Sequence, residues 1–374
     1  MKIGLALSGG GVRATVFHLG TLARLAESPR WADIKFVSTV SGGSLCIALV
    51  FEKSGQRWPG EQTFLTDVLP KIKALLTTFD LEARYKLCLF LNPRWWLTGR
   101  AGLIARLIRK HWGIVGNVSQ MPDSPRWEIC ATCYETGKNW RFSRKRMGDY
   151  IANYVVSPAF PLAEAVAASA AVPGMIGPLS LDAAKHIWLK YAPGGADPTI
   201  PAEPLARTLT LWDGGVYDNL GTEVMFKPQG GLRPEIDFLI ISDASRPLRL
   251  ETRRFQLGLP PYVPPFRLID VATDQARALR LRTFLEFLSR YPTSGAVLRM
   301  GNTVESILKK ATSQRPARWA GKRFMDESAV LSAAGIETTL RRLSESEYDG
   351  LFQHGYEVAD ATLHAYGHTA FNPA

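Results

Sequence analysis

The segment IKFVSTVSGGSLCIALVF, residues 34–51, decides the fold expected for this chain. Its first part, Ile34–Val40, is rich in apolar, β-branched and aromatic residues, which is typical of a buried strand. A serine and two glycines follow, and the apolar run Leu45–Phe51 then predicts a buried helix. A buried strand that turns directly into a buried helix is typical of the sheet of an α/β protein.

Ser41 lies at the turn between this strand and this helix, within Thr39–Gly43 (TVSGG). Such a turn lifts a hydroxyl clear of its neighbours, and the N-terminus of the following helix favours a developing negative charge. Ser41 is therefore a candidate nucleophile. A serine that only caps the helix explains the same residues, so this motif alone leaves both interpretations open.

Another strand is expected at Lys2–Leu7, and it runs into Gly9, Gly10 and Gly11 before the next helix. Without side chains in the way, a substrate oxygen can approach successive N–H groups there, and Arg13 can fix the loop or add positive charge. The spacing also fits a dinucleotide phosphate loop, but no acidic residue ends the next strand, as that motif requires. A plain glycine-rich turn remains an alternative.

Asp213 follows the expected strand Thr208–Trp212 and precedes two glycines. A partly desolvated aspartate within reach of Ser41 would accept its proton, because burial raises the pKa of a carboxyl group. An ordinary Asp-Gly turn explains the same residues. The aspartate is informative only in combination with the serine and glycine segments.

The remaining strand signals indicate an α/β fold with a mainly parallel, helix-covered central sheet. They lie at Trp127–Cys133, Trp140–Ser143 and Ile236–Ser242, separated by helical or irregular segments. We expect one domain over residues 1–374, with a basic, cap-like insertion at about 52–126 and a helical C-terminal extension at about 247–374.

The three segments, in this order, resemble the patatin-like phospholipase family. Its pattern is a glycine-rich oxyanion loop with an arginine, a G-x-S-x-G nucleophile elbow, and a later D-G-G or D-G-A. Ala168–Gly174 (ASAAVPG) and Val216–Gly221 (VYDNLG) resemble further segments of that family. Two residues depart from the pattern: Thr39 stands where the first elbow glycine is expected, and Ala14 replaces the last glycine of the loop.

The resemblance implies a three-layer α/β sandwich and a Ser–Asp dyad, with Ser41 as nucleophile and Asp213 as general base. Gly9, Gly10 and Gly11, with Arg13, correspond to the oxyanion hole. The implied reaction hydrolyses the ester bond of a phospholipid, lysophospholipid or other acyl lipid through an acyl-serine intermediate. It needs no metal and no organic cofactor. A lipid transacylase working with the same dyad is the closest alternative.

A histidine-containing triad is not expected. His354, His364 and His368 follow Asp213 in the order that many serine hydrolases use, but all three fall in late helical stretches. His18 lies in the helix after the glycine loop and is interpreted as a packing residue.

The net charge of +11 is unevenly distributed. Residues 86–146 contain twelve Lys and Arg and three acidic residues, a local charge of +9. This basic region, with its interspersed tryptophans, suggests peripheral contact with an anionic membrane, whereas no specific nucleic-acid motif accompanies the charge. Within it, Ala101–Trp112 has an apolar stripe and separate basic residues beside Trp95 and Trp96, a pattern typical of an interfacial helix.

The composition favours a cytoplasmic protein with peripheral membrane contact. No apolar stretch is long enough for a transmembrane helix, and the apolar residues after Met1 are too few for a Sec signal peptide. Four cysteines are too few for a disulfide scaffold, and Cys130 and Cys133 lie in an expected strand with side chains on opposite faces, which disfavours a metal site. A non-catalytic lipid- or nucleic-acid-binding module on this fold is the alternative from a different functional class.

Overall fold

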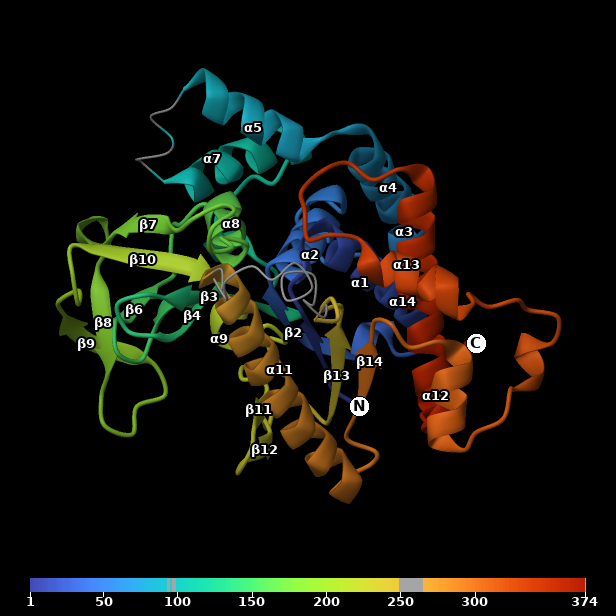
Figure 1. Cartoon of the computed structure of the whole chain (residues 1–374). Helices are drawn as coiled ribbons and strands as arrows, with labels where there is room; N and C mark the ends of the chain where they lie inside the picture. The colour runs from blue at the N-terminus through green and yellow to red at the C-terminus, as the bar shows by residue number, and fades with distance from the viewer. Residues whose placement is uncertain (93–94, 96–98, 249–264, 374) are drawn as a thin grey trace, which may run out of the picture.

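The structure is a computed structural model that describes residues 1–92, 95, 99–248 and 265–373 (Figure 1). Its centre is a twelve-stranded sheet. Adjacent strands in the central part of this sheet run parallel, in the order β14 (Gly295–Arg299), β13 (Phe238–Asp243), β1 (Ile3–Leu7), β2 (Ile34–Val40) and β3 (Arg126–Cys133). The expected α/β fold with a largely parallel central sheet is thereby confirmed.

Beyond β3 the sheet continues with antiparallel strands. They are β4 (Lys138–Ser143), β5 (Arg146–Asp149), β6 (Asn153–Val156), β8 (Trp188–Tyr191) and β9 (Pro198–Ala202). β10 (Thr208–Asp213) pairs antiparallel with the end of β3 and with β7 (Leu179–Asp182). As a result, Asp213 lies opposite Ala131 of β3, the strand that pairs on its other side with β2, which leads into Ser41.

The sheet is covered on both faces, because alternate side chains of each central strand point in opposite directions. Leu5 and Leu7 of β1 join the core beneath the helices α1 (Gly11–Ala26), α2 (Gly42–Lys53), α8 (Leu162–Ser169) and α14 (Glu345–Ala365). Ala6 joins the opposite core, which includes Leu281 and Phe284 of α11 (Pro265–Arg290). Helices, sheet and helices form the three expected layers, with α11 on one side and α1 and α14 on the other (Figure 1).

Smaller elements complete the description. They are α3 (Glu61–Thr63), α4 (Leu69–Thr78), α5 (Leu81–Leu91), α7 (Arg100–Leu107), α9 (Gly215–Asp218), α12 (Val304–Ala311), α13 (Glu327–Gly335), β11 (Phe226–Lys227) and β12 (Gly231–Leu232). Helices α5 and α7 lie together above the sheet, beside the ends of α8 and α2 (Figure 1). Among the helices that the structure describes, none has both the length and the apolar composition that crossing a bilayer requires.

The helical C-terminal part is packed tightly into the molecule. A Cβ at Gly20 of α1 would lie 2.0 Å from the Phe352 carbonyl oxygen, and one at Gly355 of α14 would lie 2.0 Å from the Phe17 carbonyl oxygen. The two helices therefore touch backbone to backbone, which only glycine permits at these positions. α14 thus buries one side of α1, the helix that begins at the glycine loop.

The prediction that Ala101–Trp112 is an interfacial helix is wrong: the segment is helical, but its apolar face does not face a membrane. The segment forms α7 and a following π-helical turn at Ile108–Trp112. Leu103, Ile104, Leu107 and Ile108 are all buried in the main core. The apolar stripe therefore packs on the protein itself and is not available to a membrane. Trp96, also part of that expectation, lies outside the described residues.

Candidate active site

Ser41 lies at a sharp turn between β2 and α2, as its sequence context predicts. Its backbone has φ 50° and ψ −112°, a conformation that costs a non-glycine residue roughly 1–3 kcal/mol. A Cβ at Gly42 would lie 2.3 Å from the Gly11 carbonyl oxygen, and one at Gly43 would lie 2.4 Å from the Leu7 carbonyl oxygen. The two glycines let the start of α2 pack directly against the end of β1 and the glycine loop.

Thr39, which departs from the expected elbow glycine, has its own role in the turn. Its buried hydroxyl oxygen accepts a hydrogen bond from the Ser44 hydroxyl at 2.9 Å and another from the Trp127 indole N–H at 2.9 Å. The threonine therefore connects the first turn of α2 to β3. The Thr39 side chain is buried in the core and lines neither of the cavities at Ser41.

Ser169 at the end of α8 supports the elbow, and it was not singled out individually from the sequence. The Ser41 N–H donates to the Ser169 hydroxyl oxygen at 2.9 Å. The Ser169 hydroxyl in turn donates to the Cys130 carbonyl of β3 at 2.7 Å and lies 2.8 Å from the Ser44 hydroxyl. The only sequence signal for this role is its place within the small-residue segment 168–174.

Asp213 ends β10 and is buried. Its Oδ1 accepts a hydrogen bond from the Gly215 N–H at 2.6 Å, which fixes the orientation of the carboxyl group. Its Oδ2 is also buried, and no group in the described part of the chain donates a well-aligned hydrogen bond to it. Burial raises the pKa of Asp213 to about 7, while the Gly215 N–H and the nearby Ser41 hydroxyl limit the rise. The carboxyl group can therefore change protonation state near neutral pH.

The two glycines after Asp213 are required by close approaches. A Cβ at Gly214 would lie 2.5 Å from the Cys130 carbonyl oxygen, and one at Gly215 would lie 2.6 Å from Asn219 Oδ1. The Asp213 N–H donates to the Ala171 carbonyl at 3.1 Å. The aspartate is thus held between β3 and the segment after α8, close to the elbow.

The glycine loop joins β1 to α1 and has free N–H donors at two positions. Gly10 and Gly11 have φ values of 141° and 61°, which side chains rarely adopt. Within the described residues, neither of their N–H groups has a protein acceptor. The Gly9 N–H, in contrast, donates to the Asn219 carbonyl at 3.1 Å. Of the three glycines expected to form the oxyanion hole, Gly10 and Gly11 are therefore available to bind an oxyanion, and Gly9 holds the loop in place.

Arg13 is buried beneath this loop and connects it to distant segments. Its Nη1 donates to the Ile336 carbonyl at 2.6 Å and its Nη2 to the Ala244 carbonyl at 3.3 Å. Burial, together with the positive charge of Arg246, lowers its pKa to about 10, and Asp243 partly offsets this. Of the two functions expected for Arg13, the contacts favour fixing the loop.

The histidines of the chain make contacts away from the candidate dyad. His18 bonds through its two ring nitrogens to the Ser242 hydroxyl at 2.8 Å and the Ser8 carbonyl at 2.9 Å, and burial lowers its pKa to about 4. His354 accepts the Gly301 N–H at 2.9 Å. Among the described residues, the hydrogen bonds of His18 and His354 involve neither Ser41 nor Asp213. Nor do the described residues contain a group of three or more His, Cys, Asp or Glu side chains arranged to hold a metal ion.

Two cavities meet at Ser41. The first, of about 260 Å³, has a mainly apolar lining: Gly11, Ser41, Leu45, Glu82, Tyr85, Lys86, Ile104, Ala170, Val172, Met175, Ile176, Thr338, Thr339 and Leu340. The second, of about 560 Å³, also contains Gly9, Gly10, Arg13 and Asp213, and its lining includes further charged residues: Arg246, Arg267, Asp270, Asp274, Arg277 and Glu337. Ser41 therefore lies where a mainly apolar cavity meets a larger cavity whose lining is partly apolar and partly charged.

Comparisons with known proteins point in the same direction. The family model for patatin-like phospholipase matches residues 5–226. A patatin-like phospholipase domain-containing protein of Coccidioides immitis (strain RS) is 29% identical over 185 residues, which are 47% of this chain and 22% of that protein. Patatin-like phospholipase domain-containing protein AN0408 of Emericella nidulans is 28% identical over 196 residues, 48% of this chain and 22% of that protein. The chain thus spans about a fifth of the length of these curated relatives.

A solved structure supports the fold. Human GIVD cytosolic phospholipase A2 superposes with a TM-score of 0.52 and 16% sequence identity, covering 99% of this chain and 62% of that chain. At this identity the similarity concerns the arrangement of helices and strands.

Proposed function

This chain belongs to the patatin-like phospholipase family, and we propose that it is a lipid acyl hydrolase in which Ser41 is the nucleophile and Asp213 the general base. One observation carries the proposal: two strand ends, far apart in sequence, direct Ser41 and Asp213 into one cavity beside the free N–H groups of Gly10 and Gly11. The raised pKa of Asp213, about 7, suits a base that must gain and lose a proton near neutral pH.

In the proposed mechanism, Ser41 Oγ attacks the ester carbonyl carbon and its proton passes to Asp213. The Gly10 and Gly11 N–H groups stabilise the oxyanion, each contributing about 3–4 kcal/mol in such sites. Collapse of the tetrahedral intermediate expels the alcohol, which takes the proton from Asp213 and leaves acyl-Ser41. Water then attacks the acyl group and gives a proton to Asp213. A second collapse releases the fatty acid and returns that proton to Ser41.

The two cavities divide the proposed substrate into an apolar and a polar part. The apolar cavity, with side chains such as Leu45, Ile104 and Met175, suits an acyl chain. The larger cavity, with Arg246 in its lining, suits the anionic part of a phospholipid or lysophospholipid. The scissile ester would lie between them at Ser41.

We further propose that α5 makes the peripheral membrane contact that the basic region 86–146 suggests. Phe90 is 82% exposed, Leu91 70% and Leu87 43%, an uncommon density of large apolar side chains on one short helix. The same helix contributes Tyr85 and Lys86 to the apolar cavity. Inserting these side chains into an anionic surface would therefore place lipid at the cavity entrance.

The first experiment measures fatty-acid release from vesicles of mixed phospholipid and lysophospholipid. We expect wild type to release fatty acid and both Ser41→Ala and Asp213→Asn to lose release by 100-fold or more, since general-base catalysis alone contributes roughly 10²–10⁴. Release that survives Ser41→Ala would refute the mechanism. Wild type that binds vesicles without releasing fatty acid would favour the non-catalytic lipid-binding alternative.

The membrane contact has its own test. Phe90→Ser is expected to weaken sedimentation with phosphatidylglycerol vesicles while hydrolysis of a soluble short-chain ester is unchanged. Ile187→Ser, which removes a side chain that is 81% exposed just before β8, is the matched control. Equal binding by both variants would exclude α5 as the contact.

Two finer points belong to this proposal. Adding a monoacylglycerol or alcohol acceptor separates hydrolase from transacylase, because a transacylase would form the acylated acceptor in place of free fatty acid.

We also propose that the protein acts at a cytoplasmic membrane surface, which its four free cysteines fit.

A further inference from the structure

A third cavity, separate from the two at Ser41, lies on the antiparallel part of the sheet. It has a volume of about 130 Å³ and lies where β3–β6 meet the segment after Asp213. Its lining is almost entirely polar and aromatic: Glu128, Asn139, Arg141, Ser143, Arg146, Gly148, Asp149, Tyr150, Tyr154, Tyr217, Glu223 and Lys227. None of these residues lines either cavity at Ser41.

The strand register explains why these side chains converge. Residues directly opposite one another on antiparallel strands point to the same face of a sheet. Arg141 of β4 lies opposite Gly148 of β5, and Gly148 lies opposite Tyr154 of β6. A Cβ at Gly148 would lie 2.1 Å from the Asn153 carbonyl oxygen, so glycine lets β6 approach β5 closely at this cavity. Asn139 lies two residues before Arg141 on the same strand and therefore on the same face.

Four buried polar atoms around this cavity have no hydrogen-bond partner among the described residues. Two are donors, Asn139 Nδ2 and Arg141 Nε, and two are acceptors, Glu128 Oε2 and Glu223 Oε2. Glu128 is 2% exposed and Asn139 7%. Buried polar groups are nearly always hydrogen-bonded, because an unmet donor or acceptor costs roughly 1–3 kcal/mol. Four such atoms around one cavity indicate a site built for a polar ligand.

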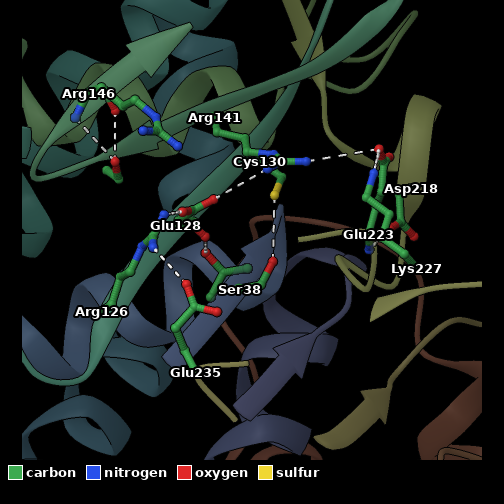
Figure 2. A network of polar contacts seen from close by, with 12 residues as sticks. Ser38, Arg126, Glu128, Cys130, Arg141, Arg146, Asp218, Glu223, Lys227 and Glu235 are labelled. Carbon is green, nitrogen blue, oxygen red and sulfur yellow. Dashed lines mark hydrogen bonds and ion pairs between the residues drawn. The ribbon is translucent and has the colours of Figure 1, made fainter. Parts of the chain in front are cut away.

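Arg141 is the centre of this arrangement, between Glu128 and Glu223 (Figure 2). Its Nη1 lies 4.0 Å from Glu128 Oε2 and its Nη2 lies 3.9 Å from Glu223 Oε1. Both distances exceed a hydrogen bond, so the guanidinium is attracted to the two carboxylates without being saturated by them. Such a group can still bind a ligand carboxylate in the planar geometry that guanidinium favours.

The neighbouring acidic groups show the difference between a satisfied and an unsatisfied carboxylate. Asp149 accepts the N–H groups of Ile151 and Ala152 at 2.8 Å each, and its other oxygen accepts the Thr136 hydroxyl at 2.8 Å. Asp149 therefore has a structural role at the turn after β5. Glu128 Oε1 accepts a hydrogen bond from Arg126, while Oε2 accepts none among the described residues and has only the longer ion pair with Arg141.

We propose that this cavity binds a small zwitterion of the α-amino acid type. Arg141 Nε and Asn139 Nδ2, which donate no hydrogen bond among the described residues, suit a carboxylate. Glu128 Oε2 and Glu223 Oε2 accept no hydrogen bond there and have only ion pairs of 4.0 Å to Arg141 and 3.7 Å to Arg280, so they suit an ammonium group. The lining has three basic and three acidic residues, which favours a ligand without net charge: Arg141, Arg146, Lys227, Glu128, Asp149 and Glu223. An engineered cavity of about 150 Å³ holds benzene, so this space suits a molecule of amino-acid size.

The site adjoins the candidate dyad through α9. Tyr217 lines the amino-acid cavity, whereas its neighbour Val216 lines the large cavity that contains Asp213. An amino acid bound in this cavity would therefore stabilise α9, the four-residue helix that begins at Gly215. Binding itself does not depend on lipid hydrolysis, so its failure and the failure of the proposed function are separate results.

The test is isothermal titration calorimetry of the full chain with glycine, L-alanine and L-serine. Acetate, methylammonium and inorganic phosphate are titrated separately, because each carries only part of the expected chemistry. We expect one saturable site for at least one amino acid, with acetate and methylammonium each at least about tenfold weaker, as the loss of a charge-assisted hydrogen bond implies. No heat from any amino acid at millimolar concentration, or equal binding of phosphate alone, would overturn the proposal.

Two variants locate the binding. Asn139→Ala removes a carboxylate donor and Glu128→Gln removes an ammonium acceptor with little change in shape, and each is expected to weaken binding about tenfold or more. Glu203→Gln, at an exposed carboxylate before β10, is the control and should bind like wild type. Unchanged binding in both cavity variants would refute the site. Urea unfolding checks that each variant is folded. If a variant does not fold, the titrations of wild type with the separate ligands still test whether the cavity binds an amino acid.

Discussion

Replacing Asp213 with asparagine is expected to abolish activity and, above neutral pH, to stabilise the folded chain. Burial raises the pKa of this carboxyl group to about 7, compared with 3.8 for an ordinary aspartate side chain. Between these values the folded chain binds the proton more tightly than the unfolded chain, so the free energy of unfolding falls as the pH rises through this window. At about 1.4 kcal/mol per pKa unit, the buried carboxylate costs about 4 kcal/mol above pH 8.

Urea unfolding at pH 5 and pH 9 measures this effect directly. Asparagine has nearly the same shape and keeps an oxygen for the Gly215 N–H, so the pH-dependent difference between variant and wild type reports the charge. That difference should grow by about 3 kcal/mol in favour of Asp213→Asn between pH 5 and pH 9, and change little above pH 8. Asp197→Asn, at a side chain that is 74% exposed, should show no such pH dependence.

The same pKa should govern catalysis by wild type. With a soluble short-chain ester, kcat/KM should fall about tenfold per pH unit below pH 7 and reach a plateau above about pH 8, because only the ionised carboxylate accepts the Ser41 proton. A stability difference that is constant from pH 5 to pH 9 would refute the raised pKa. A flat kcat/KM over the same range would refute the assignment of Asp213 as base.

Three further substitutions test the elbow. Gly43→Ala should lower the free energy of unfolding by about 1–3 kcal/mol, because its Cβ would lie 2.4 Å from the Leu7 carbonyl oxygen. Urea titration measures this change. Gly60→Ala, where a Cβ meets no atom within 4 Å, is the control. Ser41→Gly should abolish product formation yet stabilise the chain by about 1 kcal/mol through relief of the positive φ, and a lower melting temperature would contradict this. Ser169→Ala should lower kcat about tenfold with little change in KM, because the Ser41 N–H loses its hydrogen-bond acceptor. A change in KM alone would contradict the proposal that Ser169 positions Ser41.

Much of the fold could be read from local patterns. The apolar, β-branched and aromatic residues at 34–40, followed by small residues and the run 45–51, predicted β2, the sharp turn and α2, and the structure confirms all three. The glycine loop was also predictable from the sequence. Consecutive glycines indicate backbone conformations that other residues rarely adopt, and Gly11 has such a conformation, with φ 61°. The departure at Thr39 was visible in the sequence, but its hydrogen bonds to Ser44 and Trp127 join three separate elements and were not predictable.

The interfacial helix was predicted wrongly for a physical reason. The spacing of Leu103, Ile104 and Leu107 correctly indicates an apolar helix face, but periodicity does not say whether lipid or protein covers that face. In the structure α7 packs in the core, so protein covers this apolar face. Exposure of Phe90 and Leu91 on α5, the face now proposed for the membrane, is equally a result of packing.

The sequence by itself determined the order of strands and helices, the positions of Ser41 and Asp213 at strand ends, and the glycines that sharp turns require, since these depend on neighbouring residues. Only the tertiary structure decided the electrostatics and the hydrogen-bond assignments. The raised pKa of Asp213 comes from burial, and the engagement of the Gly9 N–H comes from the Asn219 carbonyl 210 positions away. Desolvation and hydrogen bonding depend on distances between segments remote in the chain, which a linear pattern does not contain.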